Sequence, residues 1–577
     1  MIMKKILFTF AFLLVSITVS AYDAKIDGIY YNLIPKGKAA FVVRGDEKYR
    51  DEISIPSTVV YEGETYNVES ILGWAFRECT NLTKVTLPDG IKEIGNDTFR
   101  DCYALESVRL PDDLETIGEF AFYWCESLAS ISLPASLKEV GGNAFNHCSG
   151  LTSVSFLGGV SKMGEKVFVD CPSLKTVTFA NGMTTIFKNM FQNCSSLESI
   201  DLPESVTTIE MGAFEKSSLK SITIPEKVKT IGAEAFAYTK LKSVVVPETV
   251  QELGKMLFYN CEELESAMLP SHVTSIPVGF FANCSSLTEI PIQQGVTTIG
   301  DAAFSGCTGL KSFALPTSVT TIGNRAFEET SFSSVEIPSH ITELGKYAFQ
   351  RCNGLESVKI DAMTDYLSTN LFQDCVNLRK VVLPENITNI REAAFKNCEA
   401  LEEINLDNIV YIYGSAFSNC KKLKSVYLPR IEILHTNVFS ECTGLTTVTL
   451  GSHISEFKNG SKYGGNTYVF KNCENLTDFY CYVEIPPISG GGDFYGAYIN
   501  YATLHVPASA IEAYRSTKPW SDFGTIIAIE STGLEEIDNG KLTIDNSSPL
   551  YNLQGQQVSH PVKGQIYIKA GKKVVVR

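Results

Sequence analysis

The sequence predicts a solenoid, a stack of short coils made mainly of strands and turns, rather than a series of separate globular domains. A phenylalanine recurs every 22 or 23 residues from Phe76 to Phe439, and a last one follows at Phe470. Most cysteines lie three residues after one of these phenylalanines, and a proline ends many of the apolar segments between them. One coil of this length cannot bury its apolar side chains alone, so neighbouring coils must stack.

Each repeat contains the alternation that is typical of a short strand. The consensus is L-x-x-V-x-L-P-x-x-[IV]-x-x-[IV]-G-x-x-A-F-x-x-C, and residues 105–125 match it closely. Val108 and Leu110 are two residues apart, so both point inward while Arg109 between them points outward. Pro111 has no N–H group and ends the strand. The eighteen anchor phenylalanines are Phe76, Phe99, Phe122, Phe145, Phe168, Phe191, Phe214, Phe236, Phe258, Phe281, Phe304, Phe327, Phe349, Phe372, Phe395, Phe417, Phe439 and Phe470.

The cysteines follow the same register. Fifteen of the sixteen lie three residues after an anchor phenylalanine, and only Cys481 does not. In a secreted protein such regular cysteines usually indicate disulfides. Equivalent side chains of stacked coils point in parallel, however, which leaves their Cβ atoms beyond the roughly 3.5–4.5 Å that a disulfide prefers. We therefore favour buried free thiols that pack as small apolar side chains. Three coils have Ser217, Thr239 and Thr330 instead, and each of these coils is one residue shorter in the following loop.

No set of residues in the sequence has the spacing of a catalytic or metal site. Nucleophile-elbow, zinc-protease and phosphate-loop motifs are absent, and no C-x-x-C pair occurs. We therefore expect no enzymatic activity, no cofactor and no metal. The seven histidines are spread over different coils: His147, His272, His340, His435, His453, His505 and His560.

The outward strand positions are where a partner would contact such a protein. The first position is Ser or Thr in thirteen of the eighteen coils. The second position varies, and in four consecutive coils it forms an apolar stripe of Val245, Met268, Pro291 and Ala314. An exposed apolar stripe can mark an interaction site. The alternative is that a crowded sheet simply tolerates these side chains.

The two ends of the chain differ from the repeats. Lys4 and Lys5, an apolar run and a small-residue site before Tyr22 predict a signal peptide, so we expect a secreted or cell-surface protein without a transmembrane segment in the mature chain. The net charge of −16 disfavours nucleic acid as a partner. The expected organisation is a signal peptide at 1–21, an N-terminal cap at 22–70, the solenoid at 71–481, a C-terminal cap at 482–530, a linker at 531–548 and a small β module at 549–577.

The repeat closely resembles the BspA-like, treponemal-type leucine-rich repeat of bacterial surface proteins over roughly residues 50–480. The resemblance implies a leucine-rich-repeat solenoid of the α/β type with about 18 coils, made mostly of short strands and turns. Residues 506–523 resemble the cap of such arrays, and residues 549–577 resemble the C-terminal sorting or anchoring segments of secreted Bacteroidetes proteins. The family is associated with adhesion, which implies binding to an extracellular protein or glycan. A structural spacer or envelope scaffold without a dedicated ligand is the alternative.

Overall fold

The structure, a computed structural model, describes residues 22–458 and 467–529 and the backbone of four short strands in the C-terminal tail. The signal peptide expected at residues 1–21 lies outside the described residues. The chain forms two compact units, Met1–Thr364 with Ser368–Pro384, and Asp365–Leu367 with Glu385–Arg577. Each unit is a stack of coils, and we describe each separately.

The first unit begins with a small sheet that closes the end of the stack. Tyr49 places its ring 4.6 Å from that of Phe76, and Tyr30 in turn lies 5.8 Å from Tyr49, so aromatic rings cover the first anchor. The strands of this sheet and its hairpin are β1 (Ala24–Ile26), β2 (Ile29–Ile34), β3 (Ala39–Val42), β5 (Thr58–Tyr61) and β6 (Glu64–Ile71). β3 pairs in parallel with β6, and β6 with the first coil strand β8 (Glu93–Ile94), which joins this cap to the solenoid.

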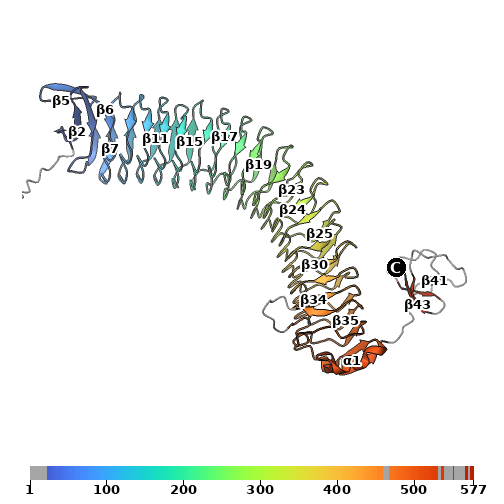
Figure 1. The fold of residues 1–577 in the computed structure, drawn as a ribbon. Helices are drawn as coiled ribbons and strands as arrows, with labels where there is room; N and C mark the ends of the chain where they lie inside the picture. Colours follow the sequence, from blue (N-terminus) through green and yellow to red (C-terminus); the bar gives the residue numbers. More distant parts are fainter. Residues whose placement is uncertain are drawn as a thin grey trace, which may run out of the picture. The chain divides into compact units, whose positions relative to one another are not determined.

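Each coil adds short strands to two columns, in which neighbouring strands pair in parallel (Figure 1). The first column carries the V-x-L segment. In the first unit it consists of β4 (Asp51–Ser54), β7 (Leu82–Thr86), β9 (Ser107–Arg109), β11 (Ser130–Leu133), β13 (Ser153–Phe156), β15 (Thr176–Phe179), β19 (Ser243–Val245), β21 (Ser266–Met268), β25 (Ser334–Ile337), β27 (Ser357–Ile360) and β29 (Lys380–Val382). In the second unit it consists of β31 (Glu403–Ile404), β33 (Ser425–Leu428), β35 (Thr447–Leu450), β37 (Asp478–Cys481), β38 (Thr503–Val506) and β39 (Thr525–Ala528).

The second column carries the segment that precedes the repeat glycine. In the first unit it continues from β8 through β10 (Thr116–Ile117), β12 (Glu139–Val140), β14 (Lys162–Met163), β16 (Thr185–Ile186), β17 (Thr208–Ile209), β18 (Thr230–Ile231), β20 (Glu252–Leu253), β22 (Ser275–Ile276), β23 (Thr298–Ile299), β24 (Thr321–Ile322) and β26 (Glu343–Leu344). In the second unit it comprises β28 (Tyr366–Leu367), β30 (Asn389–Ile390), β32 (Tyr411–Ile412), β34 (Ile433–His435) and β36 (Glu456–Lys458).

The anchor phenylalanines form a column of stacked rings inside each unit. Phe76 and Phe99 lie 5.0 Å apart with their planes 9° from parallel, and the pairs further along are similar. The rings are fully buried, so they supply much of the apolar area that the stack removes from water. In the second unit the column continues to Phe494, whose ring lies 5.6 Å from Phe470. The stack therefore extends one ring beyond the eighteen anchors identified in the sequence.

The turns around each anchor place residues in the left-handed backbone region. Around Phe99, for example, both Asp97 and Asp101 have positive φ, at 54° and 60°. Asn, Asp and Gly tolerate this conformation best, and they occupy many of the corresponding positions. Trp124, with φ 62°, is a bulky exception.

Four described coils have no strand in the first column, although the repeat pattern predicts one in each. The segments lie at residues 199–202, 221–224, 289–292 and 312–315. In the third of these, Pro291 takes the position of an outward strand residue and has no N–H group for a parallel neighbour. The column is consequently divided into separate short sheets.

Aromatic side chains close the far end of the second unit. Trp520 is fully buried, packs against Phe457, Phe479 and Phe494, and donates a hydrogen bond from Nε1 to the carbonyl oxygen of Pro487 at 3.0 Å. The only α-helix among the described residues, α1 (Ile511–Ser516), lies in this segment. Its neighbours are the 3-10 turns η1 (Ile499–Tyr501), η2 (Ala508–Ala510) and η3 (Trp520–Asp522).

The tail forms a four-stranded sheet. Its strands are β40 (Glu535–Ile537), β41 (Leu550–Tyr551), β42 (Ile566–Lys569) and β43 (Lys572–Val576), in the order β40-β43-β42-β41. β42 and β43 pair in antiparallel fashion as a hairpin. β40 lies within the stretch 531–548 that we expected to be a linker, because its polar Glu-Glu pair gave no strand pattern. Most of that stretch lies outside the described residues.

Candidate functional site

Val245 and Met268, two of the four residues of the apolar stripe, lie side by side on the outward face of the first column. β19 and β21 pair in parallel with Val245 opposite Met268, and the two residues are 60% and 58% exposed. Ser243 and Ser266 lie opposite each other on the same strands. Because alternate side chains of a strand share a face, the two apolar groups and the two serines form one mixed surface.

Pro291 and Ala314 occupy the same register position in the next two coils, outside any strand. Ala314 is exposed, whereas Pro291 is partly buried. The pairing that aligns Val245 with Met268 therefore does not extend to them. The structure brings two of the four predicted residues together in register and leaves the other two on the coils that follow.

A second group of outward side chains was missed in the sequence. Tyr427, Tyr480 and His505 take the same second outward position on β33, β37 and β38. The rings of Tyr480 and His505 stack at 4.1 Å, and His505 Nε2 lies 3.0 Å from Asp478 Oδ1. The register that located the apolar stripe also locates these residues, but a search for aliphatic side chains passes over them.

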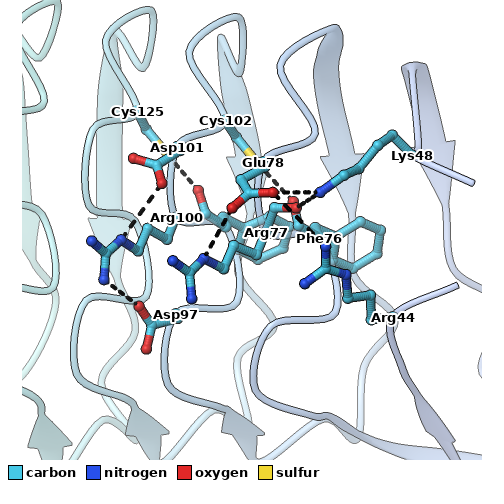
Figure 2. Close-up of polar contacts among 11 residues, drawn as sticks. Arg44, Lys48, Phe76, Arg77, Glu78, Asp97, Arg100, Asp101, Cys102 and Cys125 are labelled. Carbon is cyan, nitrogen blue, oxygen red and sulfur yellow. Dashed lines mark hydrogen bonds and ion pairs between the residues drawn. The ribbon is translucent and has the colours of Figure 1, made fainter. Parts of the chain in front are cut away.

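The cysteines form a ladder of hydrogen bonds rather than a purely apolar column. Cys102 donates from Sγ to the backbone oxygen of Phe76 in the preceding coil, at 3.0 Å, and Cys125 does the same to Phe99 at 3.2 Å (Figure 2). All sixteen cysteines are buried free thiols. The cysteines that donate to the anchor of the preceding coil include Cys102, Cys125, Cys148, Cys171, Cys194, Cys261, Cys284, Cys307, Cys352, Cys375, Cys420, Cys442 and Cys473.

In two coils without cysteine, a threonine hydroxyl donates to a different carbonyl from the one that cysteine would contact. Thr239 and Thr330 donate from Oγ1 to the anchors of their own coils, Phe236 and Phe327, at 2.8 and 2.9 Å. Each hydroxyl also lies within 3.3 Å of the next coil's cysteine sulfur. The buried Ser217 hydroxyl has no partner among the described residues. In these coils, whose following loop is one residue shorter, threonine supplies a hydroxyl donor at the position that cysteine takes elsewhere.

Burial makes these thiols poor nucleophiles. Loss of hydration raises the pKa of Cys148, Cys307 and Cys442 to about 12 in each case. Thiolate is the reactive form of cysteine, and catalytic cysteines have a lowered pKa and access to solvent. Cys148, Cys307 and Cys442 have neither property, so their arrangement is suited to packing and hydrogen bonding rather than to nucleophilic chemistry. In Cys352, burial raises the pKa but hydrogen bonds with Cys375 and Thr330 outweigh it and lower the pKa, although this thiol is also buried.

A group of charged side chains joins the N-terminal cap to the first coils (Figure 2). Lys48 donates from Nζ to the Arg77 carbonyl oxygen at 2.7 Å and to Glu78 Oε2 at 3.0 Å. Arg44 Nη2 and Arg77 Nε lie 3.8 and 3.6 Å from the same Glu78 carboxylate. The hydrogen bond from Lys48 lowers the pKa of Glu78. These charges bind one another, so the group holds the cap rather than presenting an open anion site.

The histidines contact different neighbours along the chain. His435 stacks on Tyr413 at 4.9 Å, and burial lowers its pKa. A ring nitrogen of His272 lies 2.9 Å from the Val250 carbonyl oxygen. Within the described part of the chain, no group of three or more His, Cys, Asp or Glu side chains could hold a metal. His560 lies outside that part.

A surface hollow of about 310 Å³ lies beside Trp124 in the first unit. The indole ring stacks on His147 at 4.7 Å, with planes 11° from parallel. His147 Nε2 lies 3.6 Å from Asp170 Oδ2, and Asn193 donates from Nδ2 to Asp170 Oδ1 at 2.7 Å. His147, Asp170 and Asn193 in the lining thus contact one another, and one face of the indole is covered.

Stacked coils of this length with a buried phenylalanine column define a leucine-rich-repeat solenoid. The family profile described as "BspA type Leucine rich repeat region (6 copies)" matches in overlapping segments from residue 64 to residue 514. These matches cover more than half of the sequence, and the chain belongs to this family. No curated protein matches the chain.

Solved structures of several bacterial repeat proteins are similar to the chain. A leucine-rich repeat protein from Bacteroides ovatus is 22% identical and covers 84% of this chain and 100% of its own, with a TM-score of 0.40. A leucine-rich cell surface protein from Faecalibacterium prausnitzii is 22% identical and covers 77% of this chain and 96% of its own, with a TM-score of 0.32. Among the described residues, no helix has the length and apolar character needed to cross a membrane.

Proposed function

We propose that the protein is a non-enzymatic, extracellular binding protein that acts in adhesion or partner recognition through its exposed solenoid face. Val245 and Met268 form the centre of the contact, with Pro291 and Ala314 on the following coils. The partner is an extracellular protein or glycan. The observation that carries the proposal is the paired exposure of Val245 and Met268 on one sheet.

The surroundings of this pair support a binding role. The strands that hold Val245 and Met268 are fixed by backbone pairing, so the backbone beneath these side chains needs no ordering when a partner binds. Large apolar side chains surrounded by polar groups are typical of an interaction surface. The family resemblance and the predicted signal peptide at residues 1–21 support a location outside the cytoplasm.

The test compares two pairs of residues at the same register position. Val245→Glu with Met268→Glu places two charges on the proposed contact, and Ser132→Glu with Ser155→Glu places them on β11 and β13, where Ser132 also lies opposite Ser155. Binding of the mature protein to immobilised matrix proteins and glycans is measured by biolayer interferometry. We expect the first pair to weaken binding by about tenfold or more and the second to leave it within about threefold. Equal effects of both pairs would contradict the proposed location.

A structural spacer is the second candidate. The observation that favours it is the repeated Ser or Thr at the first outward position, since a uniform polar ladder offers little specificity. The same panel distinguishes the two roles. A spacer predicts no saturable binding to any protein or glycan, with circular dichroism confirming a folded sample.

A further inference from the structure

A second hollow, of about 410 Å³, lies at the far end of the second unit. It lies between the loop that follows Cys473 and the η1 turn before β38. Its volume is within the range of roughly 300–1,000 Å³ that small-molecule sites occupy. The residues that line it are Glu474, Asn475, Leu476, Thr477, Tyr498 and Tyr501.

Two tyrosine rings are left open beside this hollow. Tyr498 is 57% exposed and Tyr501 is 84% exposed. Neither ring stacks on another ring or on a cation among the described residues, in contrast to Trp124 in the first unit. Tyr501 donates its backbone N–H to the backbone carbonyl oxygen of Tyr498 at 2.9 Å, which fixes the backbone of the two residues in one turn. A tyrosine side chain has only two rotatable χ angles, so these rings offer apolar faces to a ligand at a low cost in side-chain entropy.

The polar groups of the hollow are suited to hydroxyl partners. Asn475 donates from Nδ2 to the Thr443 carbonyl oxygen at 2.7 Å, so its amide is held in place and Oδ1 remains as an acceptor. Glu474 is exposed and adds a carboxylate, which accepts hydrogen bonds from hydroxyl donors. The Thr477 hydroxyl already donates within the protein, with the Thr446 carbonyl oxygen at 3.2 Å and Asp478 Oδ2 at 2.9 Å, so it offers a ligand only an acceptor. The two tyrosines add hydroxyl groups that can donate and accept.

We propose that this hollow binds a neutral carbohydrate. A sugar ring presents C–H groups on its faces, which pack on aromatic rings, and hydroxyls at its edge, which pair with carboxylate, amide and hydroxyl side chains. An anionic sugar is disfavoured because Glu474 is the only charged residue that lines the hollow. A peptide would need an apolar anchor pocket, and the one aliphatic lining residue, Leu476, is already buried in the core.

The site is built for binding and not for glycoside hydrolysis. Hydrolysis generally uses two carboxyl groups roughly 5–9.5 Å apart on either side of the scissile bond. Glu474 is the single carboxylate of this lining. The inference rests on the proposed binding role and names a ligand class for it, but it uses a different surface from Val245 and Met268.

Isothermal titration calorimetry tests the proposal with the mature full chain. The probes are maltohexaose, cellohexaose, xylohexaose and mannohexaose, with 6′-sialyllactose as the anionic comparison. We expect saturable binding of at least one neutral probe, with a Kd of about 1 mM or tighter and no binding of 6′-sialyllactose. Tyr498→Ala and Tyr501→Ala should each weaken it by about tenfold or more, and Tyr501→Phe should retain most of it because the ring stays.

Tyr495→Ala is the matched control. Tyr495 is 67% exposed and lies in the same segment, but it does not line the hollow. Its removal should leave the affinity unchanged. The proposal is overturned by a lack of binding to every neutral probe at about 10 mM, by tighter binding of the sialylated probe, or by an equal loss in the Tyr495 variant.

The stripe variant separates this inference from the proposed function. Val245→Glu with Met268→Glu should leave sugar binding intact whatever it does to partner binding. If the tyrosine variants leave both partner and sugar binding unaltered, the carbohydrate site is wrong and the stripe proposal stands. If Val245→Glu with Met268→Glu leaves partner binding unchanged while the tyrosine variants weaken sugar binding, the stripe proposal is wrong and the carbohydrate site stands.

Discussion

Cys102 donates a hydrogen bond from its thiol to the backbone oxygen of Phe76, 3.0 Å away in the preceding coil. The same oxygen also accepts the N–H of Cys79 in its own coil at 3.1 Å. The thiol therefore fills a remaining acceptor site of a buried carbonyl. Cysteine at this position combines an apolar volume with a donor, so an account based on apolar packing alone is incomplete.

Removing one thiol should lower the free energy of unfolding, and more so when no other hydrogen-bond donor replaces it. Cys125→Ala deletes both the sulfur and its bond to Phe99, and we expect a loss of about 1–3 kcal/mol. Cys125→Ser keeps a donor and should lose less. Urea unfolding followed by circular dichroism measures both variants. Equal losses for Ala and Ser would show that the bond contributes nothing beyond the volume.

The folded protein should protect its thiols from reagents. Because all sixteen are buried, we expect very slow reaction with a disulfide reagent such as Ellman's under native conditions. In guanidinium without reductant, all sixteen should react. A denatured, unreduced sample in which most thiols stay blocked would mean that disulfides are present.

Alkaline pH should weaken the fold. The pKa of Cys148 is near 9 when unfolded and about 12 when folded, because burial disfavours the thiolate. Between these values the unfolded chain has released the proton while the folded chain keeps it, so stability is full below about pH 9 and falls as pH rises toward 12. Thermal melting at pH 7 to 10.5 measures the effect. Cys148→Ala should show a shallower fall, and a profile as steep as that of the unmodified protein would contradict this account.

Loss of one anchor ring should destabilise the neighbouring coils. Phe236 stacks between Phe214 and Phe258 at 5.7 and 5.9 Å, and Phe236→Ala should destabilise by about 3–5 kcal/mol. In a stack, each coil contacts mainly its neighbours, so amide hydrogen exchange should rise first in the coils around Phe236. A uniform rise along the whole chain would indicate one cooperative unit instead.

The sequence was sufficient for the features that repeat. The spacing of Phe99 and Phe122 and the alternation of Val108 and Leu110 reflect local geometry, so the coil, its inward residues and the stacked core were predicted correctly. Phe494 was missed because it follows Phe470 by 24 residues and has Ala497 in place of cysteine. Pro291 marks one of the missing strands, but the consensus fits the other three coils and could not predict theirs.

The candidate sites were predicted only in part. Val245 and Met268 were found because strand alternation determines which side chains point outward. The thiol donors depend on the left-handed turns beside each anchor, such as the one at Asp101, and spacing alone does not reveal them. Tyr498 and Tyr501 were missed because their exposure depends on how an irregular segment folds over the last coils.

Along either unit, each coil offers the next nearly the same backbone donors and acceptors, as the bonds from Phe99 N to the Ala121 oxygen and from Phe122 N to the Ala144 oxygen illustrate. A whole coil could therefore be gained or lost without disturbing the register of the rest. Each such event would move the surfaces on either side apart or together by one strand spacing, about 4.8 Å. The distance between two surfaces of one unit can therefore change only in whole multiples of this spacing.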